Sequence, residues 1–184
     1  MTRNCVFEPS GGPHLMRAAG APWKVCAATW PSVSSRPGGR GNVAPRARIY
    51  DALIDAEAIS KWKVPVGMTM QVHAFEAREG GRFRISLKHD APTGTDKTTA
   101  HTDTYHGHFV KLVPNQQVVD VIEFETEDPA LRGEMTTTIT LVDAGDGTEV
   151  LAVHDGVPPG ISPADNEAGW QMAFDRLAAL VEVE

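Results

Sequence analysis

The chain has 184 residues, of which 41% are hydrophobic and 22% are charged, so it is long enough to form one domain around a buried core. Its 24 acidic and 17 basic side chains give a formal net charge of −7, which argues against nucleic acid or an anionic membrane surface as the main partner. It has no apolar run of the roughly 18 residues that span a bilayer, and it has only two cysteines, Cys5 and Cys26. We therefore expect a soluble cytoplasmic protein whose core is not held by disulfide bonds.

Residues 1–43 differ from the rest of the chain because Gly, Pro and Ser occur in them at short intervals. Such residues interrupt regular structure, so this part is predicted to be an irregular extension. Only residues 23–30 have the composition of a strand, and they form either the first strand of the domain or part of the extension. The domain itself is predicted to comprise residues 44–184.

Two short helices are predicted at the start of the domain. Pro45 suits the first turn of one helix, whose apolar stripe includes Ile49 and Leu53. Asp55 is a favourable N-cap for a second helix over Ala56–Trp62.

Apolar and polar residues then alternate in a series of segments, which is the pattern of half-buried strands. Short turns join most of these segments, so neighbouring strands are predicted to pair antiparallel. The predicted strands cover residues 68–75, 82–88, 105–113, 118–125, 134–142 and 148–155.

The last predicted element is a helix over Pro163–Val183. Ser162 is a favourable N-cap residue, and Trp170, Phe174 and Leu177 lie on one apolar face. About twenty residues at ~1.5 Å each reach ~30 Å, which is enough to cross a sheet of about six strands. The elements together predict an α+β domain in which a curved antiparallel sheet wraps around a long C-terminal helix. An apolar small-molecule cavity is expected between the two.

Five short stretches, in this order of elements, resemble a known superfamily. The stretches are Ala44–Leu53, Arg78–Arg84, Tyr105–Val110, Gly147–Val150 and Asn166–Trp170. They resemble the START-like helix-grip (SRPBCC) superfamily, and within it bacterial proteins similar to the C-terminal domain of the activator of the heat-shock-protein-90 ATPase. The resemblance implies a helix-grip fold with two short helices after the first strand. It implies less about function, because this fold hosts lipid carriers, hormone receptors, cyclases and co-chaperone domains.

The chain departs from the family pattern at its first strand. The family has a strand directly before the first helix, where this chain has the glycine-rich residues 38–43. Either residues 23–30 supply the first strand through a long loop, or the sheet lacks a well-formed first strand.

Seven histidines raise the question of a metal site. His106 and His108 lie on the same side of a strand, because side chains alternate between the two faces. Zinc would need a third ligand, such as His73, Asp120 or His154. The chain has no His-Glu-x-x-His or Cys-x-x-Cys motif, so we predict neither a metal nor a cofactor.

Asp120 is the candidate polar residue of the cavity. It shares a strand face with Val118, Ile122 and Phe124, so it is hydrogen-bonded, has a raised pKa, or is solvated at an open edge of the strand. The functional interpretation pairs it with His106 on the neighbouring strand. Such a polar pair would orient a ligand or, in an enzyme, serve as acid or base.

The candidate ligand-binding residues combine these polar groups with aromatic and apolar walls, although most of the wall residues would also be expected in an ordinary core. They are Trp62, Met70, Val72, Phe83, His106, His108, Asp120, Ile122, His154, Trp170 and Phe174.

Three functions are compatible with these features. The preferred hypothesis is binding of an apolar or amphipathic small molecule between the sheet and the C-terminal helix. The first alternative is a co-chaperone-like module that stimulates the ATPase of a heat-shock-protein-90 homologue, although 43 irregular residues cannot supply the N-terminal domain of the eukaryotic activators. The second alternative is a cyclase or hydrolase that uses His106, Asp120 or His154, although no spacing in the sequence enforces a catalytic geometry.

Overall fold

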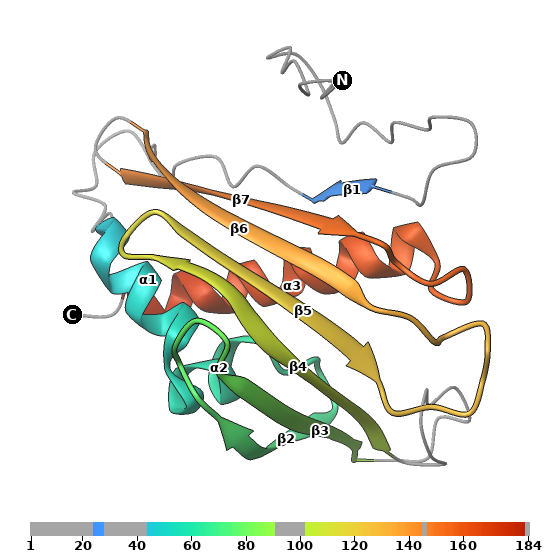
Figure 1. The fold of residues 1–184 in the computed structure, drawn as a ribbon. Coiled ribbons are helices and arrows are strands. Elements are labelled where there is room, and N and C mark those ends of the chain that lie inside the picture. The colour runs from blue at the N-terminus through green and yellow to red at the C-terminus, as the bar shows by residue number, and fades with distance from the viewer. Residues whose placement is uncertain (1–23, 28–43, 91–101, 145–146, 183–184) are drawn as a thin grey trace.

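The computed structural model describes residues 24–27, 44–90, 102–144 and 147–182 (Figure 1). The residues predicted as an irregular extension, apart from 24–27, lie outside the described part. The described elements are β1 (Lys24–Ala27), α1 (Arg46–Ile54), α2 (Ala56–Trp62), β2 (Met68–Phe75), β3 (Arg82–His89), β4 (Thr102–Val113), β5 (Gln117–Phe124), β6 (Met135–Ala144), β7 (Gly147–Asp155) and α3 (Pro163–Val181).

The strands form one antiparallel sheet in the order β1-β7-β6-β5-β4-β3-β2. From β2 to β7, each strand pairs with the next along the chain. β1 lies inside the segment 23–30 and pairs with β7, so this segment adds a seventh strand to the six predicted from residue 68 onward. Because β1 is separated from α1 by residues 28–45, the first strand does not directly precede the first helix.

The helices lie on one face of the sheet, which we call the inner face. Figure 1 shows α3 running along this face, with α1 and α2 beside it. α2 contacts both α1 and α3, and α1 also contacts β5 and β6. The predicted α+β helix-grip architecture is confirmed. Within the described residues, no helix combines the length and the apolar composition that a membrane crossing requires.

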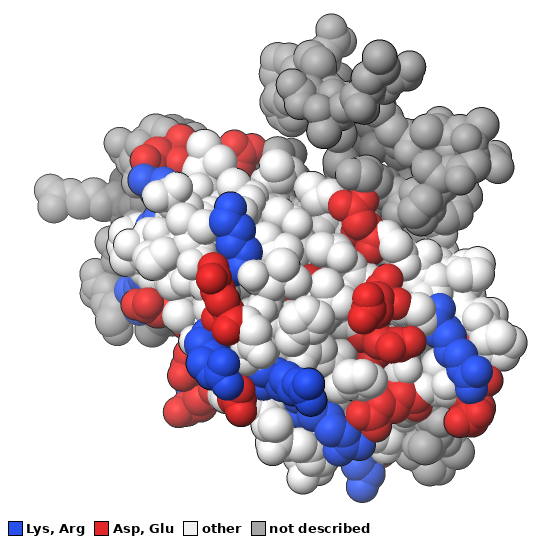
Figure 2. Space-filling view, viewed as in Figure 1, with Lys and Arg blue, Asp and Glu red and all other residues white. Residues whose placement is uncertain are grey.

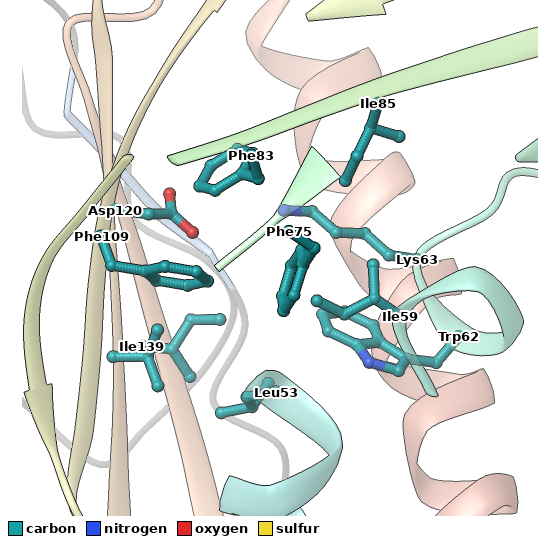
Figure 3. Close-up of a pocket in the computed structure, with 11 residues that line it drawn as sticks. Leu53, Ile59, Trp62, Lys63, Phe75, Phe83, Ile85, Phe109, Asp120 and Ile139 are labelled. Carbon is teal, nitrogen blue, oxygen red and sulfur yellow. The ribbon is translucent and has the colours of Figure 1, made fainter. Parts of the chain in front are cut away.

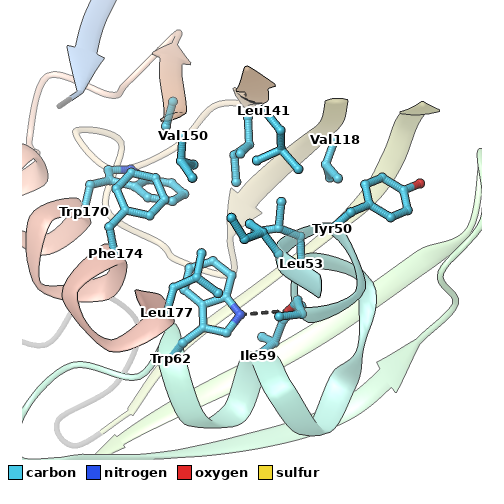
Figure 4. Packing of buried hydrophobic residues seen from close by; sticks show 14 of the residues in the cluster. Tyr50, Leu53, Ile59, Trp62, Val118, Leu141, Val150, Trp170, Phe174 and Leu177 are labelled. Atoms are coloured by element: carbon cyan, nitrogen blue, oxygen red, sulfur yellow. Dashed lines mark hydrogen bonds between the residues drawn. The ribbon is translucent and has the colours of Figure 1, made fainter. Parts of the chain in front are cut away.

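Alternation along the strands decides which side chains form the core. In β6, Ile139 and Leu141 are buried, while the residues between and beside them are more exposed. The same alternation in β5 and β7 turns one apolar face toward α3, where Trp170, Phe174 and Leu177 are buried against it (Figure 4). Burying one such side chain stabilises the fold by about 1.5–3 kcal/mol. The core therefore fills the space between the centre of α3 and the sheet.

Asp55 caps α2 as predicted, because its Oδ1 accepts a hydrogen bond from the backbone nitrogen of Ala58 at 2.7 Å. Asp55→Ala is expected to lower the free energy of unfolding by about 0.5–2 kcal/mol, since the helix loses a partner for an N–H group. Asp55→Asn retains an oxygen acceptor and should lose much less. Urea unfolding followed by circular dichroism measures both variants. Equal losses would show that this hydrogen bond is not the source of the stability.

Candidate functional site

Two β-bulges lie beside a cluster of three phenylalanine rings. The pairing of β2 with β3 shifts between Val72 and Ala74, and the pairing of β4 with β5 shifts just after Phe109. An extra residue of this kind bends a strand and changes which face its side chains meet. The rings of Phe75, Phe83 and Phe109 lie with their centroids 5.2–6.2 Å apart. They form one aromatic wall on the inner face.

Gly107 makes room for this wall. It pairs with Phe83 across β3 and β4, and it stands between His106 and His108. A Cβ atom at this position would lie 2.7 Å from Cζ of Phe83 and 2.1 Å from the carbonyl oxygen of Val121, which is closer than real Cβ atoms approach. The absence of a side chain therefore lets the Phe83 ring lie over the backbone of β4.

A cavity of about 20 Å³, enough for one water molecule, lies between the α1–α2 pair and strands β2–β6 (Figure 3). Its helix side is formed by Leu53, Ile59, Trp62 and Lys63, and its strand side by Phe75, Phe83, Ile85, Phe109, Val118, Asp120 and Ile139.

The position of this cavity differs from the prediction. We expected a cavity between the sheet and the C-terminal helix, but none of the described α3 residues lines the cavity found here. Trp170 and Phe174 fill part of the space under α3, with their ring centroids 5.4 Å apart. This cavity lies where the shorter helices α1 and α2 cover the sheet.

Asp120 is the only carboxylate among the lining residues, and it is 6% exposed. Burial raises the pKa of Asp120, because the ionised carboxylate loses its hydration, while Lys63, Thr137 and His108 act in the opposite direction. Thr137 lies directly opposite Asp120 on β6. The contact between the two side chains does not meet the geometry of a hydrogen bond, because Oδ1 of Asp120 and Oγ1 of Thr137 have no partner with such geometry among the described residues.

Lys63 faces Asp120 across the cavity (Figure 3). It directly follows α2 and is half-buried, with its Nζ atom 5.9 Å from the ring centroid of Tyr105 and 5.6 Å from that of Trp170. These distances are in the range of cation–π attraction. The neighbouring Trp62 donates a hydrogen bond from Nε1 to the carbonyl oxygen of Ala52 at 2.9 Å, which holds the end of α2 against α1. The lysine is thus positioned by aromatic rings and by a fixed helix end.

His154 holds α3 against the sheet. Its Nδ1 lies 3.4 Å from Nε1 of Trp170 and 3.1 Å from Nδ2 of Asn166, both on α3. The indole N–H can only donate, so Nδ1 accepts this hydrogen bond. His154 is buried and acts in this attachment; it is not among the residues that line the cavity.

His106 and His108 lie on the outer face of the sheet. His106 is opposite Glu123 in β5, whereas Asp120 is opposite Phe109, so the side chains of His106 and Asp120 point to different faces. The predicted pairing of His106 with Asp120 is therefore wrong. The enzyme hypothesis loses this pair of groups, whereas Asp120 and His154 both lie opposite Thr137 on the inner face.

The outer face carries a polar cluster around Glu125. Arg84 donates two hydrogen bonds of 2.7 Å to the Glu125 carboxylate, and Nδ1 of His106 lies 3.5 Å from it. The hydrogen bonds from Arg84 lower the pKa of Glu125, with smaller contributions from His106 and His73. Figure 2 shows acidic and basic side chains interspersed with uncharged ones on this face. Among the described residues, no three His, Cys, Asp or Glu side chains are grouped so as to hold a metal ion.

Three of the predicted site residues line the cavity, namely Trp62, Phe83 and Asp120. The other apolar candidates lie in the surrounding core without lining it; they are Met70, Val72, Ile122, Trp170 and Phe174.

Sequence reasoning missed the other eight lining residues, among them Lys63, Phe75 and Phe109. Lys63 gave no usable signal, because a basic residue at a helix C-terminus is favoured by the helix dipole alone. Phe75 is an odd number of residues from Val72, so strict alternation places the two on opposite faces. The bulge in β2 reverses this, and both Val72 and Phe75 pair with inner-face residues of β3.

The sequence profile of the family described as "Activator of Hsp90 ATPase homolog 1-like protein" matches residues 43–182. This chain belongs to that family. The predicted resemblance is thereby confirmed over the whole of the described domain from α1 to α3. No functionally curated protein matches the chain.

Solved structures share the family fold. A protein from Chromobacterium violaceum is 33% identical with a TM-score of 0.68, and the match covers 77% of this chain and 92% of that protein. A protein from Rhodobacter sphaeroides is 15% identical with a TM-score of 0.66, covering 92% and 97%. An AHSA1-like protein from Aeromonas hydrophila is 17% identical with a TM-score of 0.57, covering 77% and 88%. At the level of the family, this START-like fold supports a ligand-binding domain.

Proposed function

We propose that this protein binds an apolar or amphipathic small molecule in the cavity beside Asp120, in the cytoplasm. The proposal rests mainly on one observation. Oδ1 of the buried Asp120 has no hydrogen-bond partner among the described residues, and this side chain lines a cavity whose other walls are mostly apolar and aromatic. Ligand sites commonly combine such walls with a few polar groups.

The described conformation is closed to a ligand. A volume of about 20 Å³ holds one water molecule, so a larger molecule requires the walls to move. Lys63 and Phe75 are the lining side chains that are only half-buried, and the cavity therefore approaches the surface beside them. Arg176 on α3 donates a hydrogen bond to the carbonyl oxygen of Val64, next to Lys63. Opening the cavity at this point would displace the connection between α2 and β2.

Binding of an anilinonaphthalene sulfonate dye tests the proposal. The native protein should bind the dye saturably and release it to hydrophobic small molecules. Ile139→Phe adds a ring to the cavity wall and should weaken dye binding about tenfold, since overfilling a packed site costs about 1–3 kcal/mol. Val142→Phe is the matched control, because Val142 lies on the same strand but is 44% exposed.

Two results would contradict the proposal. One is dye binding that does not saturate, and the other is equal weakening in the Ile139 and Val142 variants. Native mass spectrometry of freshly purified protein provides a dye-independent measurement, in which a bound molecule should be lost from Ile139→Phe and kept by Val142→Phe.

The family match favours one second candidate, a module that stimulates the ATPase of a heat-shock-protein-90 homologue. The matching family is described as that of an activator of this ATPase, and the match covers residues 43–182. The test is the ATPase rate of a bacterial homologue with and without this protein. Stimulation by the native protein, together with the absence of dye binding, would rank this candidate first.

A further inference from the structure

Two neighbouring polar atoms on the inner face have no hydrogen-bond partner among the described residues. Oδ1 of Asp120 and Oγ1 of Thr137 have no partner among the described residues, and their side chains are 6% and 1% exposed. The two residues are directly opposite each other on β5 and β6. Leaving a buried polar group unpaired destabilises the folded protein. Asp120 lines the cavity and Thr137 does not, so a group in the cavity can pair directly with Asp120.

The size of the cavity limits how large a group can bind next to Asp120. Asp120 lines a space of about 20 Å³, which accommodates one water-sized group beside the carboxylate. Apart from Lys63, and from Trp62 whose Nε1 is hydrogen-bonded to Ala52, the other lining side chains offer no hydrogen bonds. One small polar group therefore fits next to Asp120, and the rest of a ligand meets mainly apolar walls.

The charges around the cavity limit the chemistry of that group. The ammonium of Lys63 faces the carboxylate of Asp120, so with both groups ionised the site is already neutral (Figure 3). A charged ligand would leave one unbalanced charge in a desolvated site, which is costly. A hydroxyl group carries no charge, and it can both donate and accept. It therefore fits Asp120 in either protonation state.

We propose that Asp120, with Thr137 directly beside it on β6, forms a subsite for the hydroxyl group of an otherwise apolar alcohol. This inference rests on the proposed function, since it names the class of molecule that the cavity takes. The hydroxyl replaces the single water that the closed cavity can hold. The apolar tail then extends along the aromatic wall toward Phe75, where the cavity approaches the surface.

A matched set of probes tests this subsite. Octanol, octane, octanoate and octylammonium share one tail and differ in the head, and their affinities are measured by displacement of the dye from the full chain. Octanol should bind about tenfold more tightly than octane, since a hydrogen bond to a carboxylate is worth about this factor. It should also bind more tightly than octanoate and octylammonium.

Variants of Thr137 and Asp120 test which side chains cause the preference for octanol over octane. Thr137→Val removes the hydroxyl with little change of shape and should lower the ratio of octanol to octane affinity. Thr138→Val is the matched control, because Thr138 follows on the same strand and pairs with Val119 and Val153 on the outer face. Asp120→Leu leaves Lys63 without its opposite charge, so octanoate should become the preferred probe. Ratios of affinities are compared within each variant, so a loss of folded protein does not alter the result.

The outcomes separate this inference from the proposed function. If all four probes bind equally, or if octanoate is preferred by the native protein, the hydroxyl subsite is overturned while ligand binding stands. An octanol preference that survives both Thr137→Val and Asp120→Leu also overturns it. If neither the dye nor any probe binds, the proposed function fails and the inference fails with it.

Discussion

Replacing Phe174 by alanine is expected to lower the free energy of unfolding by about 3–5 kcal/mol. The side chain is 2% exposed, and its ring lies 5.4 Å from that of Trp170 between α3 and the sheet. Removing it takes away the transfer free energy of a buried ring and leaves a space that the neighbouring side chains fill only in part. For a chain of this size, each kcal/mol corresponds to about 2–4 °C in Tm.

Met172→Ala is the control for this variant. Met172 lies on α3 two residues before Phe174 but is 43% exposed, so truncating it should change the stability by no more than about 0.5 kcal/mol. Urea unfolding followed by circular dichroism measures both. Similar losses in the two variants would mean that the buried face of α3 is not the one described.

The second large effect is a change in the pH dependence of stability in Asp120→Asn. Burial raises the pKa of Asp120 in the folded protein above its unfolded value. Over the pH range between these two values the folded protein holds a proton that the unfolded chain has released. The contribution of Asp120 is therefore fully present below the unfolded pKa of about 4 and is lost as the pH rises through the folded pKa.

Asparagine carries no charge at any of these pH values, so Asp120→Asn does not lose stability in this way. Between the two pKa values, the stability of Asp120→Asn should rise relative to the native protein by about 1.4 kcal/mol per pH unit. Urea unfolding at a series of pH values from acid to neutral measures the difference. Asp51→Asn is the control, because Asp51 is exposed on α1 and keeps its contact with water. Parallel pH profiles for the native protein and Asp120→Asn would contradict the burial of an ionisable carboxylate.

Ionised Asp120 is thus expected to lower the stability of the ligand-free protein. Natural proteins often break the rules of core packing at the places where they bind or react. A more stable Asp120→Asn variant with an altered octanol preference would show that stability and ligand recognition compete at this position. If the variant is more stable but its probe affinities are unchanged, the loss of stability caused by Asp120 is unrelated to ligand binding.

Local patterns were sufficient for most of the fold. Proline in the first turn and Asp55 as N-cap predicted α1 and α2, and the alternation of apolar residues predicted the six strands from β2 to β7. Trp170, Phe174 and Leu177 predicted the buried face of α3. Each of these signals depends on residues a few positions apart, because helix and strand periodicities are local. The same reasoning correctly placed Asp120 on an apolar strand face.

The site required information that no local pattern contains. His106 and Asp120 are on neighbouring strands, but the register of β4 against β5 decides that they face opposite sides of the sheet. The bulge in β2 moved Phe75 onto the inner face against the alternation of its own strand. Lys63 reached the cavity only because α2 lies across the sheet and beside α3.

The sequence by itself therefore determined the three helices, strands β2 to β7, their order and most of their buried faces. Only the tertiary structure decided which polar groups meet at the cavity, because strand register and helix placement depend on the packing of residues far apart in the chain.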